Sequence, residues 1–248
     1  MQRVGNRQAS RRHDGSGPLT FWFETLCIVT AVAAILAHLY RLWQHRHDLS
    51  LWMLAAILLA WLAADFVSGL VHWLADTWGS EAFPILGPRF IKPFRVHHVT
   101  PNSFLECNLV DTNGDTSLVA LPVLTALWMI PLSHPMGLFS LTFGVAFCAM
   151  AIPTNQIHQW AHMRRPPGWV RWLQRRGLIL SHREHARHHA LPHEGHYCIT
   201  TGFCNQWLEK IKFFRCLEAI VTRLTGVRPR LEEEQSRSYV RTVASRQP

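Results

Sequence analysis

The chain has 248 residues, of which 48% are hydrophobic and only 17% charged, and its formal net charge is +9. Because the apolar residues gather in segments long enough to cross a bilayer, this composition favours a membrane protein over a soluble domain. The basic excess is typical of cytoplasmic flanks; nucleic-acid binding is not expected, because no RNP motif, zinc-finger spacing or basic coiled-coil region occurs. The six cysteines form no CxxC pair, which indicates a reducing compartment.

Four apolar segments are predicted to cross the membrane as helices. They span residues 19–40, 49–75, 117–132 and 136–162. The third is short and Pro122 would kink it, so the last two could instead form a re-entrant pair. The first is too long for the core of a signal peptide and is expected to be retained. The predicted membrane domain, 19–227, is flanked by a basic disordered tail, 1–18, and a polar tail, 228–248.

Four crossings would place both termini on one side of the membrane. The arginines of the N-terminal tail and of the C-terminal third indicate that this side is cytoplasmic. The connection 76–115 falls on the same side, whereas the connection 133–137 falls outside and has no Lys or Arg. Arg41 and Arg46 lie in the other outer connection, and these positive charges argue slightly against this orientation.

Two amphipathic stretches follow the fourth predicted span. Residues 168–180 alternate Trp and Leu with Arg, and residues 205–226 place apolar side chains on one helical face. Such helices suit the headgroup region of a bilayer, although a soluble-domain helix packed on its neighbours would show the same pattern. The predicted fold is therefore an all-α integral membrane protein with about four transmembrane helices, interfacial amphipathic helices and a histidine-rich cytoplasmic cap.

Histidines are concentrated on the predicted cytoplasmic side. The stretch 181–196 alone holds six of the 16 histidines of the chain. Residues four apart share one face of a helix, as His158 does with His162 and His72 with Asp76. Neutral imidazole is the commonest metal ligand, so this convergence predicts a metal site.

The imidazoles outnumber the four ligands that one zinc ion takes, and they suffice for two metal ions with open positions. Imidazole with carboxylate suits iron, and an open position lets iron meet dioxygen. A zinc protease is not favoured, because neither "HREH" nor "HEGH" has the HExxH spacing. For the stretch 181–196 taken alone, a surface metal-scavenging tract or a pH sensor is the alternative.

Several sequence blocks resemble the plasmanylethanolamine desaturase family, whose relatives include plant plastid desaturases that introduce a trans double bond into phosphatidylglycerol acyl chains. These blocks are "DFVSGLVHWLADTWGS" (65–80), "IKPFRVHHVTP" (91–101), "DTNGD" (111–115), "TNQIHQWAH" (154–162) and "HARHHALPHEGHYCITTG" (185–202). They agree in order, and the resemblance covers about residues 50 to 227.

The resemblance implies a multi-pass di-iron membrane enzyme, an oxidoreductase that uses dioxygen and two electrons. It would convert the 1-O-alkyl chain of an ether phospholipid, plasmanylethanolamine, to the vinyl ether of a plasmalogen. The implied metal ligands are His72, Asp76, His97, His98, His158, His162, His185, His188, His189 and His193. Asn113, Asp115 and Asn155 also match, either as partners that hold imidazoles in one tautomer or as turn residues.

The lipid phosphate could be bound by basic residues, whose alternative role is membrane topology and attraction to anionic lipids. The candidates are Arg89, Lys92, Arg95, Arg164 and Arg165. No cluster-binding or haem-attachment motif occurs, so a separate electron-transfer protein, cytochrome b5-like or ferredoxin-like, is the expected partner. The excess of Arg over Lys favours the bacterial inner membrane, or the endoplasmic reticulum membrane in a eukaryote, with the active site on the cytoplasmic side.

Two other functions stay open at this point. A desaturase or hydroxylase of another acyl lipid would share the chemistry and differ in its product. A non-enzymatic metal-binding or transport protein would bind zinc as well as iron and consume no oxygen. Transport also predicts ionisable residues along several spans, and mid-span charges are nearly absent here.

Overall fold

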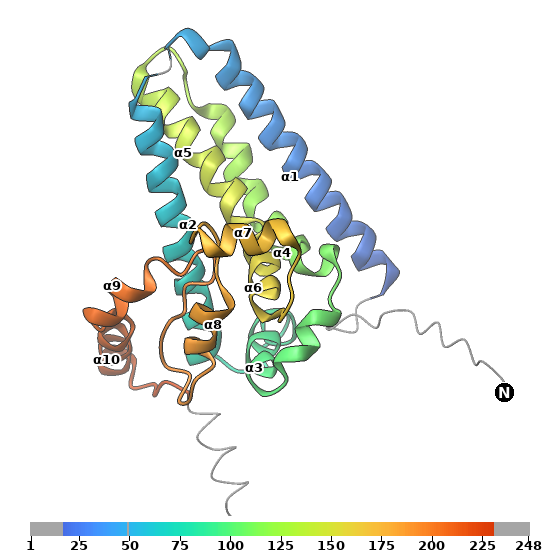
Figure 1. Ribbon diagram of the computed structural model, residues 1–248, viewed down its shortest axis with the longest axis vertical. Coiled ribbons are helices and arrows are strands. Elements are labelled where there is room, and N and C mark those ends of the chain that lie inside the picture. Colours follow the sequence, from blue (N-terminus) through green and yellow to red (C-terminus); the bar gives the residue numbers. More distant parts are fainter. Residues whose placement is uncertain (1–16, 49, 231–248) are drawn as a thin grey trace, which may run out of the picture.

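The computed structural model describes residues 17–48 and 50–230, and over these ranges the regular secondary structure is entirely helical. Four helices lie side by side along the long axis and form an elongated bundle (Figure 1). They are α1 (Pro18–Gln44), α2 (Trp52–Thr77), α4 (Leu109–Ala126) and α5 (Pro135–Ala151). The predicted all-α architecture is confirmed for the described residues.

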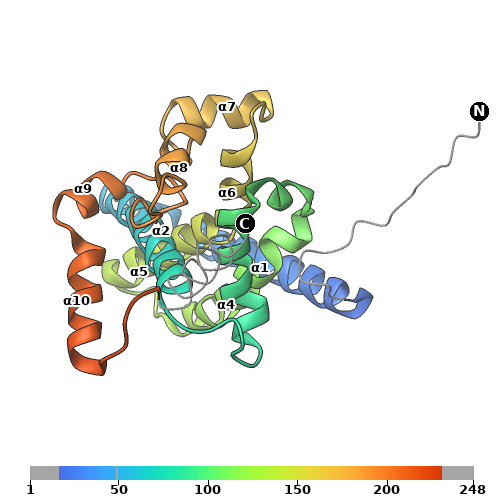
Figure 2. The ribbon, with the colours of Figure 1, turned by 90° about the horizontal axis from the view of Figure 1, so that it is seen from below.

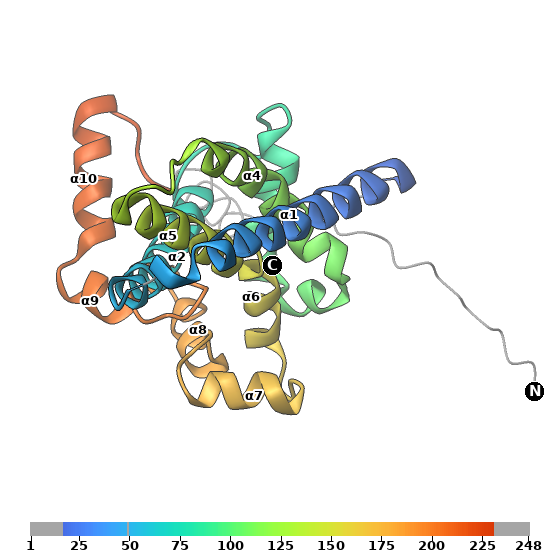
Figure 3. The same ribbon diagram turned by 90° about the horizontal axis from the view of Figure 1, so that it is seen from above.

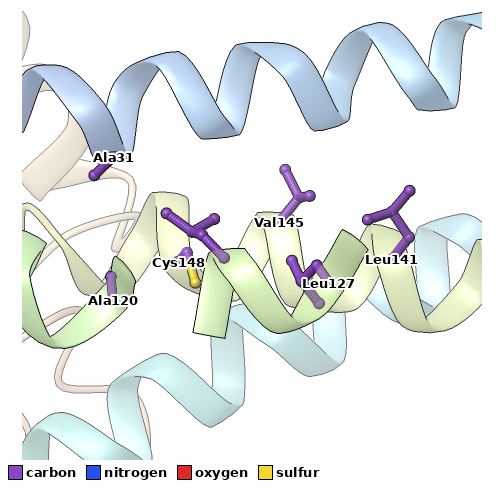
Figure 4. Close-up of a cluster of buried hydrophobic side chains, with 7 residues drawn as sticks. Ala31, Ala120, Leu127, Leu141, Val145 and Cys148 are labelled. Carbon is purple, nitrogen blue, oxygen red and sulfur yellow. The ribbon is translucent and has the colours of Figure 1, made fainter. Parts of the chain in front are cut away.

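Small side chains let the helices of the bundle approach closely. Helix α1 packs chiefly on α4, and α2 packs on α5. Ala31 of α1 and Ala120 of α4 are buried in one cluster with Leu141 and Cys148 of α5 (Figure 4). Such small residues at helix–helix contacts are typical of helices that associate within a membrane.

Three helical segments of the described chain are long and apolar enough to cross a membrane: Pro18–Gln44, Trp52–Thr77 and Pro135–His162. They correspond to three of the four predicted spans. Many of their large apolar side chains, such as Leu26 and Leu58, face outward, where lipid would cover them. The exposed apolar surface indicates a membrane protein.

The remaining predicted span, the third at 117–132, does not satisfy the same criterion, so a count of four is not confirmed. Helix α4 begins earlier, at Leu109, and its first turns carry Asp111 and Asp115. After Pro122 the helix tightens into the 3₁₀ turn η4 (Leu127–Met129). The apolar part of α4 is therefore short, and the polar part belongs to the site described below.

A cap of shorter helices covers one end of the bundle (Figure 1). It comprises η2 (Gly87–Ile91), α3 (Lys92–Val99), η3 (Pro101–Glu106), α6 (Thr154–His162), α7 (Gly168–Arg175), α8 (His182–His188), α9 (Asn205–Lys210) and α10 (Phe213–Thr225). The opposite end holds the short turn η1 (Arg46–Asp48) and the connection from α4 to α5. The cap carries the histidine-rich segments.

The two predicted amphipathic helices both need correction. The predicted helix 205–226 is two helices, α9 and α10, because Lys212 adopts a left-handed backbone conformation with φ of 53°. The stretch 168–180 is helical only in α7, since Gly177 is left-handed as well. Helices α7 and α10 both run across the long axis of the molecule (Figures 2 and 3).

Candidate metal centre

The metal-ligand candidates come from four elements that converge at the cap end of the bundle. Nine of the ten predicted ligands fall into two groups, and within each group the ligand atoms all lie within 4.8 Å of one another. Group one consists of His97, His158, His162, His185 and His189. Group two consists of His72, Asp76, His98 and His188. Neighbouring residues of α3 and α8 supply ligands to both groups, so the two groups are adjacent.

In group one, the imidazole Nε2 atoms point at a common centre. The Nε2 atom of His185 lies 2.7 Å from that of His162, 2.8 Å from that of His158 and 3.0 Å from that of His189. The Nε2 atom of His97 is 3.1 Å from that of His158 and 2.9 Å from that of His189. Five rings from three helices thus enclose one point.

In group two, three imidazoles surround one carboxylate. The Oδ2 atom of Asp76 lies 3.2 Å from His72 Nε2 and 3.5 Å from the Nε2 atoms of His98 and His188. His72 and Asp76 are four residues apart on α2, so the helical repeat directs both side chains to the same place. His72 and His188 are completely buried.

Backbone carbonyls fix the orientation of two of these rings. The Nδ1–H group of His72 donates to the carbonyl oxygen of Tyr197 (3.1 Å), and that of His188 donates to Gly195 (2.7 Å). With the proton on Nδ1, the lone pair of Nε2 faces the centre of the group and is available to a metal.

A buried aspartate anchors the loop that follows these carbonyls. Asp65 of α2 accepts hydrogen bonds from the backbone N–H groups of Thr201 (2.7 Å), Gly202 (2.9 Å) and Cys204 (2.9 Å). The Ser68 hydroxyl, one turn later, accepts the N–H group of Ile199 at 3.0 Å. Helix α2 therefore supplies both ligands and the supports of the loop that orients them.

Burial favours the neutral form of several imidazoles in the two groups. It lowers the pKa of His98 to about 2, with a further contribution from His188 and His189 nearby. It also lowers the pKa of His188 to about 3 and that of His189 to about 4. His97 and His185 are shifted in the same direction, again mainly by desolvation. Neutral rings are the form that binds metal.

The donor set fits a metal ion better than it fits a hydrogen-bonded network. A neutral imidazole carries one N–H group, so the three close Nε2 contacts of His185 cannot all be hydrogen bonds. Lone pairs crowded at these distances repel one another unless a cation lies between them. The two groups could thus each hold one metal ion, and together they combine imidazole with one carboxylate.

The remaining histidines of the cap lie outside both groups. His193 is adjacent: its ring centroid lies 4.8 Å from that of His98, and its Nδ1–H group contacts the carbonyl oxygen of His188 at 3.3 Å. The Nδ1–H group of His182 donates to the carbonyl oxygen of Ala161 at 2.7 Å. The structure therefore separates these two histidines from the nine clustered ligands.

The predicted asparagine and aspartate positions lie near the groups without contacting their imidazoles through any described hydrogen bond. Asn113 donates to the carbonyl oxygen of Leu109 (2.8 Å) and stabilises the start of α4. Asp115 accepts from Arg89. Asn155 lines the cavity described next.

A cavity of about 350 Å³ leads from group one into the bundle between α2, α4 and α5. His97 and His158 form part of its wall. Its other lining is mainly apolar and includes Val71, Phe94, Phe104, Val119, Phe147 and Ala151. Such a lining suits a hydrocarbon chain next to the metal groups.

Charged side chains also line this cavity. Among the five predicted phosphate ligands only Arg89 lines it; Lys92, Arg95, Arg164 and Arg165 do not. Arg95 instead donates to the carbonyl oxygens of Trp78 and Gly79. Glu24, which lies within the first predicted span, also lines the cavity and was not among the predicted site residues. A charge inside an apolar helix was the signal that could have identified it.

A bundle of apolar helices, capped by two histidine-rich groups that could hold metal ions and enclosing an apolar cavity beside them, is the arrangement expected of a membrane enzyme that acts on lipids. Residues 61–232 match the lipid desaturase domain, and the chain belongs to this family of oxidoreductases. It is 40% identical to plasmanylethanolamine desaturase of Myxococcus xanthus, over 94% of this chain and 83% of that protein.

The chain is also similar to two eukaryotic proteins. Plasmanylethanolamine desaturase 1 of Mus musculus is 38% identical over 94% of this chain and 87% of that protein. The chloroplastic fatty acid desaturase 4 of Arabidopsis thaliana is 34% identical over 73% of this chain and 55% of that protein. No solved structure matches the chain.

Proposed function

We propose that the protein is a di-iron, dioxygen-dependent desaturase that converts the 1-O-alkyl chain of plasmanylethanolamine to the vinyl ether of a plasmalogen. The observation that carries this proposal is that His97 and His158 belong to group one and also line the apolar cavity. The names of the two most similar relatives reported above support the choice of lipid.

The nine clustered ligands would hold two iron ions, one in each group. Iron bound there would supply the oxidising power that removes two hydrogens from adjacent unactivated carbons, which no side-chain acid or base can do. One dioxygen, two electrons and two protons balance this loss, and the products are the vinyl ether and two waters.

The protein would position the alkyl chain and exclude water. Phe94 and Phe104 pack beside the imidazoles, with ring centroids 5.0 Å apart for His72 and Phe94 and 5.1 Å apart for Phe104 and His158. These aromatic rings, together with the valines of α2 and α4, would keep the first two carbons of the chain in an apolar environment next to group one.

The electrons would come from a separate protein, because the sequence has no cluster-binding or haem-attachment motif. We propose a cytochrome b5-like or ferredoxin-like partner that approaches the cap from the cytoplasm. The exposed Trp169 and Trp172 of α7 would anchor the cap at the membrane surface, with the arginines of α7 near the lipid phosphates. In a bacterium the membrane would be the inner membrane.

Lipid analysis of cells that express the chain and are fed an alkyl-ether lipid tests the proposal. We expect an acid-labile product that releases an aldehyde, together with two iron ions per purified chain. Cells expressing a His158→Ala variant serve as the control and should form no such product. Iron-loaded protein that yields no vinyl ether in cells with an active electron-transfer chain would contradict the proposal.

The similarity to fatty acid desaturase 4 favours one second candidate, a desaturase of another acyl lipid. It would use the same metal groups and the same cavity, and it differs in where the double bond forms. Mass spectrometry of the product separates the two, because a vinyl ether breaks in acid and an acyl-chain alkene does not.

A further inference from the structure

The wall of the cavity contains a guanidinium group between two carboxylates. Arg89 Nη2 lies 3.2 Å from Glu24 Oε1 and 2.5 Å from Asp115 Oδ1. The three residues come from η2, α1 and α4, and all three line the cavity. The cluster therefore connects three separate elements at the wall of the cavity.

This cluster is formed by a close approach of α1 to α4. A Cβ atom at Gly114 would lie 2.6 Å from Cβ and 2.7 Å from Cγ of Glu24, which is too close for any other residue. Gly114 thus admits the Glu24 side chain between the two helices, directly beside Asp115. The "DTNGD" block is explained in part by this contact, which the sequence alone did not reveal.

The chemistry of the proposed reaction requires the lipid head group to lie near the metal groups. The carbons that lose hydrogen are the first two of the alkyl chain, and only the ether oxygen and the glycerol separate them from the phosphate. A head-group site must therefore open into the cavity that His97 and His158 line. The cluster of Arg89, Glu24 and Asp115 meets this requirement.

The charges of the cluster match a zwitterion. A guanidinium group binds phosphate oxygens, and carboxylates accept hydrogen bonds from an ammonium group. Of the described residues that line the cavity, the acidic ones are Glu24, Asp111 and Asp115, and the basic one apart from the two histidines is Arg89. This negative balance favours a lipid whose head group carries a cation over a purely anionic lipid.

We propose that Arg89, Glu24 and Asp115 form a head-group site for phosphoethanolamine. In this site the guanidinium group binds the phosphate, and the two carboxylates accept hydrogen bonds from the ammonium group. A trimethylammonium group has no N–H to donate, so the site discriminates against choline. The inference rests on the proposed function and specifies which residues select its substrate.

The test compares two alkyl-ether lipids with the same chains and with ethanolamine or choline as head group. Vinyl-ether formation is measured in membranes containing the full-length protein, its Glu24→Gln and Asp115→Asn variants, and Asp48→Asn as a control at the far end of the bundle. We expect the wild-type protein and the control to prefer the ethanolamine lipid. Each site variant should reduce kcat/KM for that lipid roughly tenfold or more and affect the choline lipid less.

A second measurement needs no variant. Glycerophosphoethanolamine should inhibit the wild-type protein, and glycerophosphocholine should not. Equal inhibition by both compounds, or an equal loss of activity on both lipids in the site variants, would overturn the head-group site and leave the three residues a packing role. If the wild-type protein converts neither lipid, the proposed function itself fails, so the two failures are distinguishable.

Discussion

The Nε2 atoms of His98 and His188 lie 2.9 Å apart, and each is 3.5 Å from the same Oδ2 atom of Asp76. These residues are separated by at least 22 positions in the sequence and come from α3, α8 and α2. The carboxylate is thus the one acidic member of the two groups, and the imidazoles of group two gather around it.

Replacing Asp76 with Asn should remove the metal ion of group two and leave that of group one. The amide keeps the shape of the side chain but loses the negative charge of the carboxylate, which is the anionic ligand that accompanies histidines at non-haem iron sites. We expect the iron content of the purified protein to fall from two ions to one per chain and desaturation to stop. Asp48→Asn is the matched control and should keep both ions; two ions in Asp76→Asn would contradict the assignment.

The metal-free protein should lose stability as the pH falls. The pKa values of His188 and His189 are about 3 and about 4 in the folded protein, against an ordinary value of 6.5. Between pH 6.5 and these values the unfolded chain binds more protons than the folded chain, so the free energy of unfolding decreases as the pH is lowered. Below about pH 3 these two groups add no further change.

Thermal unfolding of the metal-free protein in detergent at pH 7.5 and pH 5 checks this expectation. The unfolding midpoint should be lower at pH 5. A His188→Gln, His189→Gln double variant should show a smaller difference between the two pH values. A pH dependence that is identical in the two proteins would show that other groups are responsible.

Removing the carboxylate of Asp65 should destabilise the protein strongly. Two buried backbone N–H groups and one partly buried one lose their acceptor in Asp65→Ala, and each unsatisfied buried donor costs about 1–3 kcal/mol, so a loss of about 3 kcal/mol or more is expected. Ser68→Ala removes one acceptor and should cost about 1 kcal/mol. Denaturant titration in detergent measures both; equal losses would argue against the anchoring role of Asp65.

A bulky residue in the cavity should impair catalysis without removing metal. Ala151 lines the cavity on α5, and Ala151→Phe would occupy space that the proposed alkyl chain needs. We expect kcat/KM to fall by about 100-fold, since small displacements of a substrate have effects of that size, while the iron content stays the same. Leu58→Phe, on the outward face of α2, is the control and should keep full activity.

Much of the candidate metal centre could be predicted from the sequence, because helical spacing directs residues such as His158 and His162 to one face. The division of the ligands into two groups could not, since it depends on how α2, α3, α6 and α8 cross. The exclusion of His193 from both groups follows from the path of the chain after α8, which has no periodic pattern. Glu24 was missed for a similar reason, because its contact with Arg89 depends on how η2 lies against α1.

The membrane topology was less predictable than the ligands. Of the four spans predicted from hydropathy, three correspond to helical segments that are long and apolar enough to cross a membrane. Hydropathy could not define α4, because the first half of this helix is polar and the second half is apolar. The break at Lys212 was also unpredicted, because a left-handed residue inside an amphipathic pattern leaves the pattern itself unchanged.

The origin of the ligands in four separate helices has a consequence for how the protein matures. Each bound ion would act as a non-covalent cross-link between segments that are distant along the chain, so metal uptake and completion of the cap become one coupled equilibrium. A cell that is short of the metal would then accumulate a protein that is loosely assembled as well as inactive.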